Sequence, residues 1–216
     1  MEGNLFPAWT SKVRDLLPLL LGGGALYVVV IVAFGFSANT LAVGYAPEQP
    51  VPFSHRLHAG ELGMDCRYCH NTVEVSAKAA IPPTATCMNC HDKVQGDSAQ
   101  LEPVRDSWAT GEPMRWERVH DLPDHVYFNH SAHVTRGVGC VECHGRIDQA
   151  EVVRQEEKLT MGWCLDCHRN PEDALRPVSE VTNMDWVAED QAALGALLAA
   201  ERDINPPVTN CSGCHR

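Results

Sequence analysis

The sequence predicts a mostly irregular and α-helical chain, with one transmembrane helix near its N-terminus and short helices elsewhere. Three observations lead to this prediction. Residues 16–36 form an uncharged apolar run, only 6% of the residues are aromatic, and ten cysteines are spread over a chain rich in glycine and proline. A folded domain of this size ordinarily needs more bulky side chains for its core. We therefore expect covalent cofactors to supply part of the buried apolar surface.

The N-terminal part is predicted to anchor the chain in a membrane. Residues 1–15 form a short polar segment, and an apolar helix over residues 16–36 is about 31 Å long, close to the thickness of the bilayer core. Pro18 and the three glycines at 22–24 lower helix propensity but are tolerated in membrane helices. The run is longer than the apolar part of a signal peptide, and no A-x-A cleavage site follows it.

The basic residues Lys12 and Arg14 precede the apolar run. By the positive-inside rule they place residues 1–15 in the cytoplasm and the rest of the chain outside. We therefore expect a single-pass protein of the bacterial inner (cytoplasmic) membrane. Residues 37–52 are predicted to be a linker, and residues 53–216 a periplasmic domain.

All ten cysteines occur in pairs of the form CxxCH. A disulfide framework has no reason to place a histidine after every second cysteine, and zinc ribbons use two CxxC pairs per metal without that histidine. CxxCH is instead the attachment sequence of c-type haem. The cysteines are Cys66, Cys69, Cys87, Cys90, Cys140, Cys143, Cys164, Cys167, Cys211 and Cys214, and the histidines are His70, His91, His144, His168 and His215.

These motifs predict five covalently bound haems c and a multihaem cytochrome c fold. The two thiols of each motif add to the haem vinyl groups, and the histidine ligates the iron on one face. Cysteines three apart on a helical turn direct both sulfur atoms towards one edge of the porphyrin.

An internal repeat divides the predicted haem domain. FSHRLH (53–58) precedes the first two CxxCH motifs, and FNHSAH (128–133) precedes the next two. The expected parts are a dihaem module over 53–91, a linker over 92–119, a second dihaem module over 120–168, and a C-terminal haem segment over 169–216. Within that last segment, residues 186–204 are expected to form one helix.

Six further histidines are available as second axial ligands. Each of the five irons can therefore have a protein ligand on both faces. This favours an electron relay over a catalyst, which needs an iron with a free coordination position (an open iron). We expect His55 and His130 to serve the haem of their own following motif, and His58 and His133 to reach a neighbouring haem. His120 is favoured over His125 as the fifth ligand, with His125 expected to be solvated or merely hydrogen-bonded. Met161 is an alternative ligand, since methionine also binds haem iron, although packing explains it equally well.

The net charge of −11 argues against nucleic acid as a partner. Haem propionates would add further negative charge. The balance is compatible with docking to a basic protein surface, and equally with simple solubility.

The motifs also resemble known proteins. The FxHxxH…CxxCH modules look like the class III cytochrome c3/c7 group, and the wider pattern resembles the pentahaem subunit of Alternative Complex III. The segments that carry the second resemblance are FPAW near the N-terminus, VPFSHRLHAGELGMDCRYCH, VHDLPDHVYFNHSAHVTRGVGCVECHG, LTMGWCLDCHRNP and INPPVTNCSGCHR.

This resemblance implies a place in a quinol-oxidising membrane complex. The implied partners are an iron–sulfur subunit related to molybdopterin oxidoreductases, polytopic quinol-binding membrane subunits and monohaem cytochrome c subunits. The implied role is to relay electrons to a periplasmic cytochrome c or copper-protein acceptor. At the positions that match, His55, His58, His120, His130 and His133 carry over as ligands, while the matching position Met161 has no assigned role.

Two alternative functions remain open at this point. One is a membrane-anchored multihaem quinol dehydrogenase of the tetrahaem type that feeds a periplasmic reductase. The long linker between the predicted helix and the first haem motif argues against direct contact with quinol. The other is a multihaem reductase, which would need one open iron.

Overall fold

The structure is a computed structural model that describes residues 7, 9–35, 42–204 and 208–215. It consists of two compact units, residues 1–42 and residues 43–216. Residues 1–6 and 8 of the expected N-terminal segment, Phe36 at the end of the expected helix, residues 37–41 of the expected linker, and residues 205–207 and 216 of the C-terminal segment lie outside the described residues.

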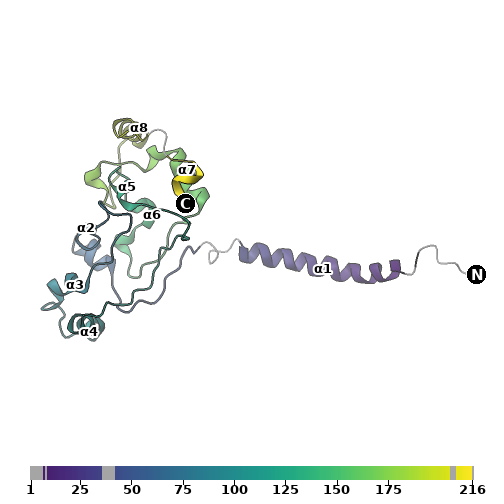
Figure 1. The fold of residues 1–216 in the computed structure, drawn as a ribbon, viewed down its shortest axis with the longest axis horizontal. Helices are drawn as coiled ribbons and strands as arrows, with labels where there is room; N and C mark the ends of the chain where they lie inside the picture. The colour runs from purple at the N-terminus through teal and green to yellow at the C-terminus, as the bar shows by residue number, and fades with distance from the viewer. Residues whose placement is uncertain (1–6, 8, 36–41, 205–207, 216) are drawn as a thin grey trace, which may run out of the picture. The chain divides into compact units, whose positions relative to one another are not determined.

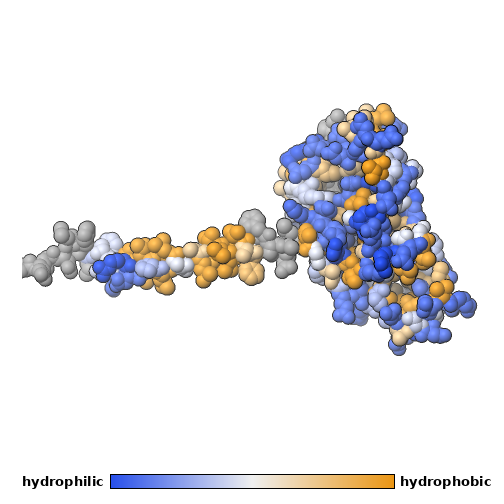
Figure 2. Space-filling view, turned by 180° about the vertical axis from the view of Figure 1, so that it is seen from behind, coloured by the Kyte–Doolittle hydropathy of each residue, from blue (hydrophilic) through white to orange (hydrophobic). Residues whose placement is uncertain are grey.

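The first unit contains helix α1 (Trp9–Gly35), which has Pro18 in its interior. It begins seven residues before the expected start at residue 16, because the polar residues 9–15 continue the same helix; the Thr10 amide and hydroxyl both donate to the Pro7 carbonyl. Figure 2 shows hydrophobic residues over most of α1 and hydrophilic ones near its beginning. Within the described part of the chain, α1 is the one helix long and apolar enough to cross a membrane, so it fits a single-pass anchor.

The second unit is built from short helices and irregular segments (Figure 1). Over the described ranges it contains no β-strand, only the isolated bridges Val126–His215 and Val138–Leu175. The predicted fold class is thereby confirmed. The helices are η1 (Arg56–Glu61), α2 (Cys66–Cys69), α3 (Thr84–His91), η2 (Ala99–Leu101), α4 (Glu102–Thr110), α5 (His130–Val134), α6 (Val141–His144), η3 (Ile147–Gln149), α7 (Met161–Arg169), η4 (Pro171–Ala174), η5 (Val178–Glu180), α8 (Gln191–Glu201) and α9 (Cys211–Cys214).

The apolar core of this unit is small. Its main cluster consists of Leu175, Leu198 and Ala199, where α8 packs against η4. Gly195 permits this close approach, because a Cβ atom there would clash with the Glu172 carbonyl oxygen. Among the described side chains of this unit, only Leu175 and Val181 are large and fully buried. So few buried residues agree with an interior that is completed by covalent cofactors.

Helix α8 is shorter than the sequence predicts. It begins at Gln191 rather than near residue 186, because the Asp190 carboxylate accepts a hydrogen bond from the Ala193 amide (3.0 Å) and caps the helix. It ends at Glu201, with Arg202 as its C-cap. The residues before Asp190 are not helical, and Trp186 lies 5.2 Å from the guanidinium of the buried Arg176.

Candidate haem-binding sites

Each CxxCH motif lies on a short helical turn, as the sequence predicts. The backbone amides of His70, His144 and His215 donate to the carbonyl of the first cysteine of their motif, at 2.9–3.0 Å, and the other two motifs lie within α3 and α7. Residues just before three of the motifs cap these turns: Asp65 accepts from the Arg67 amide, Thr160 from Trp163 and Asn210 from Gly213. The turn places the two sulfur atoms of a motif on the same side.

All ten cysteines lie in the described part of the chain, and all are free thiols. A disulfide framework is therefore not the explanation of their number. The described residues also contain no group of three or more His, Cys, Asp or Glu side chains gathered closely enough to hold a metal ion directly. The cysteine pairs thus remain available for thioether attachment.

Most of the histidines hold one ring nitrogen against the backbone, as metal-binding histidines usually do. A metal-bound histidine usually holds its second ring nitrogen by a hydrogen bond, often to a backbone carbonyl, which fixes the ring and leaves Nε2 for the metal. Seven of the eleven histidines bring Nδ1 within 2.7–3.2 Å of a backbone carbonyl oxygen. They are His58, His70, His91, His130, His133, His168 and His215.

Two histidine pairs have the spacing that a shared iron requires. The ring centres of His58 and His91 are 6.1 Å apart, and those of His133 and His168 are 6.0 Å apart. Since metal–imidazole bonds are about 2 Å long, two imidazoles on opposite faces of one iron have ring centres about 6 Å apart. Both pairs join the second histidine of an FxHxxH sequence to the second CxxCH motif of the same module.

The phenylalanine of each FxHxxH sequence orients both of its histidines. The Phe53 ring stacks on His58 at 4.4 Å and meets the edge of His55 at 4.9 Å. Phe128 does the same with His133 at 4.5 Å and with His130 at 4.7 Å. This role of the phenylalanines was not predicted, although their fixed place in the repeat was the signal in the sequence that could have identified it.

His55, His120 and His130 lie around the motifs of His70 and His144. His120 and His144 have ring centres 4.5 Å apart, closer than a shared iron requires, and His55 lies within electrostatic range of His70. Burial lowers the pKa of His55 to about 4 and that of His144 to about 3. Imidazoles held neutral in this way are in the form that binds a metal. The ring atoms His55 Nδ1, His120 Nε2 and His144 Nδ1 are buried without a hydrogen-bond partner.

The two copies of the sequence repeat contact each other reciprocally. The Arg56 amide donates to the Ala150 carbonyl (3.0 Å), in the loop that follows the motif of His144. The His130 amide donates to the Ala77 carbonyl (3.1 Å), in the loop that follows the motif of His70. Each FxHxxH segment therefore contacts the loop that follows the first CxxCH motif of the other repeat, a long-range exchange that the repeat itself does not predict.

Neighbouring motifs contact one another in a definite order. The first two motifs meet where Asn89 Nδ2 donates to the Tyr68 hydroxyl (3.2 Å). The first and third meet where the Cys66 and Cys140 side chains lie close enough to shift each other's pKa. In Figure 1, α3, α2, α6 and α7 follow one another in this direction, with the C-terminus beside α7.

The later motifs continue this line. Cys143 of the third motif lies within electrostatic range of Cys167 of the fourth. Cys164 of the fourth lies within range of Cys214 of the fifth, and His168 Nδ1 is 2.7 Å from the carbonyl oxygen of Val208, just before the fifth motif. The sites thus follow the order second, first, third, fourth, fifth.

His125 and Met161 are the two residues that the sequence left undecided. His125, expected to be solvated or merely hydrogen-bonded, is exposed, and its ring stacks on that of His215 with ring centres 5.4 Å apart. Met161 is the first residue of α7, and 66% of its surface is exposed.

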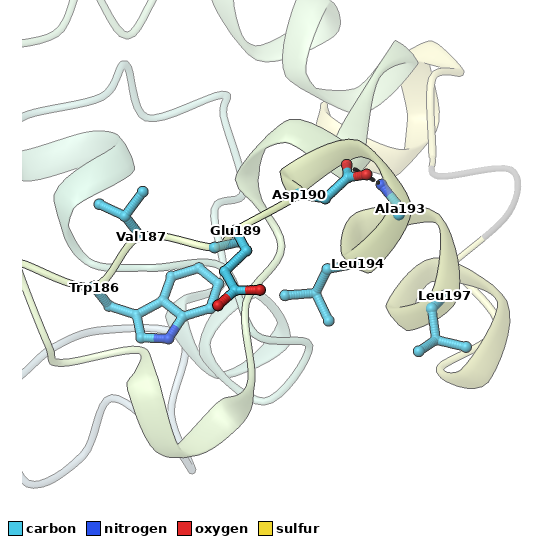
Figure 3. Close-up of a pocket in the computed structure, with 8 residues that line it drawn as sticks. Trp186, Val187, Glu189, Asp190, Ala193, Leu194 and Leu197 are labelled. Carbon is cyan, nitrogen blue, oxygen red and sulfur yellow. Dashed lines mark hydrogen bonds between the residues drawn. The ribbon is translucent and has the colours of Figure 1, made fainter.

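A surface pocket beside α8 is separate from these sites. It is lined by residues 186–190 and by Ala193, Leu194 and Leu197, none of them cysteine or histidine (Figure 3). Val187 is 85% exposed and Leu197 is 63% exposed. The pocket is therefore a feature of the α8 surface and not of the candidate haem sites.

Helical CxxCH turns, carbonyl-anchored histidines and facing imidazole pairs in a unit with little apolar core define a multihaem c-type cytochrome, a class of electron-transfer protein. Comparison with known families agrees. Residues 51–104 and 126–216 match the family of cytochrome c7 and related cytochrome c, and the chain belongs to this family. His120 and His125 lie in the stretch between the two matched ranges.

A related protein is the menaquinone reductase, multihaem cytochrome c subunit, of Nitratidesulfovibrio vulgaris (strain Hildenborough). It is 35% identical to this chain over 175 residues, which cover 69% of this chain and 82% of that protein.

Proposed function

We propose that this chain relays electrons through five covalently bound haems c within a membrane-bound quinone oxidoreductase complex. The observation that carries the proposal is the unbroken line of five CxxCH motifs, with imidazoles gathered at every one. Each haem, when bound, supplies a one-electron Fe(III)/Fe(II) couple. The chain's own residues would attach each haem, supply both axial ligands of its iron and place it next to the following haem.

The proposed ligands follow from the geometry. His58 and His133 close the irons held by His91 and His168. Two of His55, His120 and His130 close those held by His70 and His144, since these three imidazoles lie around that pair. Irons closed by two protein ligands exchange electrons without binding substrate, so the proposed role is relay and not catalysis.

The proposed setting is the periplasmic side of a bacterial inner membrane, with α1 as a single-pass anchor. Quinone chemistry is assigned to polytopic partner subunits, and further redox partners are an iron–sulfur subunit, monohaem cytochromes and a periplasmic acceptor. The long segment between α1 and the first CxxCH motif supports this division, because quinone chemistry requires contact at the membrane.

The direction of electron flow has two candidates. The resemblance to Alternative Complex III favours flow from quinol to an outer acceptor. The related menaquinone reductase subunit favours flow towards menaquinone instead. The relay is the same in both cases, and the reduction potentials of the end haems relative to the native quinone distinguish them.

The test uses the full chain purified in detergent with its haems attached. A pyridine haemochrome assay and the intact mass are expected to give five haems c per chain. A redox-titrated paramagnetic resonance spectrum is expected to contain only low-spin ferric species, with no carbon monoxide binding after reduction. Fewer than five haems would contradict the proposed count, and an open iron in the wild type would favour the reductase alternative.

A matched pair of variants tests the ligand assignment. His58→Ala is expected to convert one iron to a high-spin form that binds carbon monoxide. His58→Met is expected to keep that iron low-spin but raise its reduction potential, because methionine ligation does so. An unchanged spectrum in His58→Ala would show that this histidine does not close an iron.

A further inference from the structure

The C-terminal CxxCH motif is joined to a distant segment around His125. Val126 and His215 form an antiparallel bridge, and the Tyr127 amide donates to the Cys214 carbonyl at 2.8 Å. The two segments are 90 residues apart in sequence. This contact brings a histidine from outside both FxHxxH sequences to the fifth motif.

The two histidine rings at this junction are arranged for a shared metal. His215 Nδ1 lies 3.2 Å from the carbonyl oxygen of His125, so that a protonated Nδ1 donates there and Nε2 stays free. The rings are 5.4 Å apart with an interplanar angle of 26°. Their separation is less than 1 Å short of the roughly 6 Å that two imidazoles on one iron require.

The other ligand candidates are placed elsewhere. His58 faces His91 and His133 faces His168, while His55, His120 and His130 lie around the motifs of His70 and His144. Met161 begins the helix that carries the fourth motif, and its side chain is mostly exposed. His125 is the one histidine that the described structure brings to His215.

We propose that His125 is the second axial ligand of the C-terminal haem, opposite His215. The inference rests on the proposed function, since it presumes that Cys211 and Cys214 carry a haem. His125 lies outside the ranges matched by the cytochrome c7 family, so the family match does not supply this ligand. It gives the terminal haem two imidazole ligands and a lower reduction potential than histidine–methionine ligation would.

The experiment compares His125→Ala, His125→Met and Met161→Ala in the full holo chain. His125→Ala is expected to turn one of the five ferric irons from low-spin to high-spin and to create one carbon monoxide site on reduction. His125→Met is expected to keep all irons low-spin and to raise one reduction potential. Met161→Ala is expected to leave the spectrum unchanged. Asp124→Ala, a change on the same exposed loop that keeps the imidazole, serves as the matched control.

A second background assigns the change to the fifth site. In a Cys211→Ala/Cys214→Ala chain, which lacks the fifth attachment site, His125→Ala is expected to produce no further spectral change. A high-spin iron that still arises on adding His125→Ala to this background would place His125 at another haem and overturn the proposal.

Two further outcomes would also overturn it. One is a high-spin iron in Met161→Ala together with an unchanged His125→Ala. The other is an unchanged spectrum in both Met161→Ala and His125→Ala. The number of bound haems distinguishes this result from failure of the proposed function. Five haems together with an unaltered His125→Ala spectrum reject His125 as the ligand but leave the proposed relay in place. If His125→Ala does not accumulate as a folded protein, the test is the reduction potential of the terminal haem in His125→Met. A potential equal to that of the wild type rejects the assignment.

Discussion

Breaking the buried ion pair of Arg176 tests how the third CxxCH motif is supported. Arg176 Nη2 donates to the carboxylate of Glu142 at 2.6 Å, and Nη1 donates to the Asn183 carbonyl at 3.1 Å. Glu142 lies between the two cysteines of the third motif. The Arg176 side chain is only 6% exposed, whereas that of Glu142 is 33% exposed. The pair therefore ties the segment after η4 to the haem-binding turn.

The two single substitutions are expected to differ in cost. Glu142→Gln leaves a buried guanidinium without its counter-charge and is expected to destabilise the fold by about 3–4 kcal/mol. Arg176→Met leaves the Glu142 carboxylate unpaired, but this group is one-third exposed and so still partly hydrated. The expected loss of stability is about 2–3 kcal/mol, which includes the lost contact with Trp186. The double variant leaves no orphaned charge and is expected to cost only about 2 kcal/mol.

The measurement is guanidinium unfolding of the four holo proteins, followed by Soret circular dichroism. The double-mutant cycle is expected to give a coupling energy of about 3–5 kcal/mol. Single-variant costs that add to within about 0.5 kcal/mol would refute the reasoning, because the two charges would then not depend on each other.

Three further changes probe local features. Asp65→Ala removes the cap of α2 and is expected to cost about 1 kcal/mol in thermal unfolding, more than the capping-competent Asp65→Asn. The hydrogen bond from Arg67 lowers the pKa of Asp65, so the loss in Asp65→Asn is expected to be fully present at neutral pH and to shrink progressively as the pH falls below about 4, towards the lowered pKa. A pH-independent difference would contradict this. Gly195→Ala is expected to reduce stability by about 2–3 kcal/mol, because the added methyl group forces α8 away from η4. The control Gly162→Ala has open space around it and is expected not to destabilise the fold. Equal effects of the two changes would reject the packing argument. Phe53→Leu is expected to cost about 1 kcal/mol and to shift one low-spin resonance signal, and an unaltered spectrum would show that the ring does not orient His58.

The sequence was most informative where the chemistry is local. A CxxCH motif contains both attachment points and one axial ligand within five residues, so its recognition needs no fold. A membrane-spanning helix is likewise set by length and composition, and only the start of α1 differed from the expectation. The predicted start of α8 was wrong, because apolar periodicity does not show that Asp190 caps the helix.

Ligand pairing was harder to predict because it depends on long-range docking. The neighbours of His125 in sequence give no sign that it meets His215, and the contact arises from the bridge at Val126 and the hydrogen bond at Tyr127. The FxHxxH repeat identified four histidines but did not show which motif each one meets. Backbone bonds between Arg56 and Ala150, and between His130 and Ala77, set that arrangement.

The sequence by itself therefore determined the kind of cofactor expected, the number of attachment motifs and the presence of an apolar anchor helix, because each is encoded in a contiguous stretch of residues. Only the tertiary structure decided which imidazoles face each other and in what order the five sites follow. Those properties depend on contacts between segments up to 90 residues apart, in a unit whose own apolar core is small.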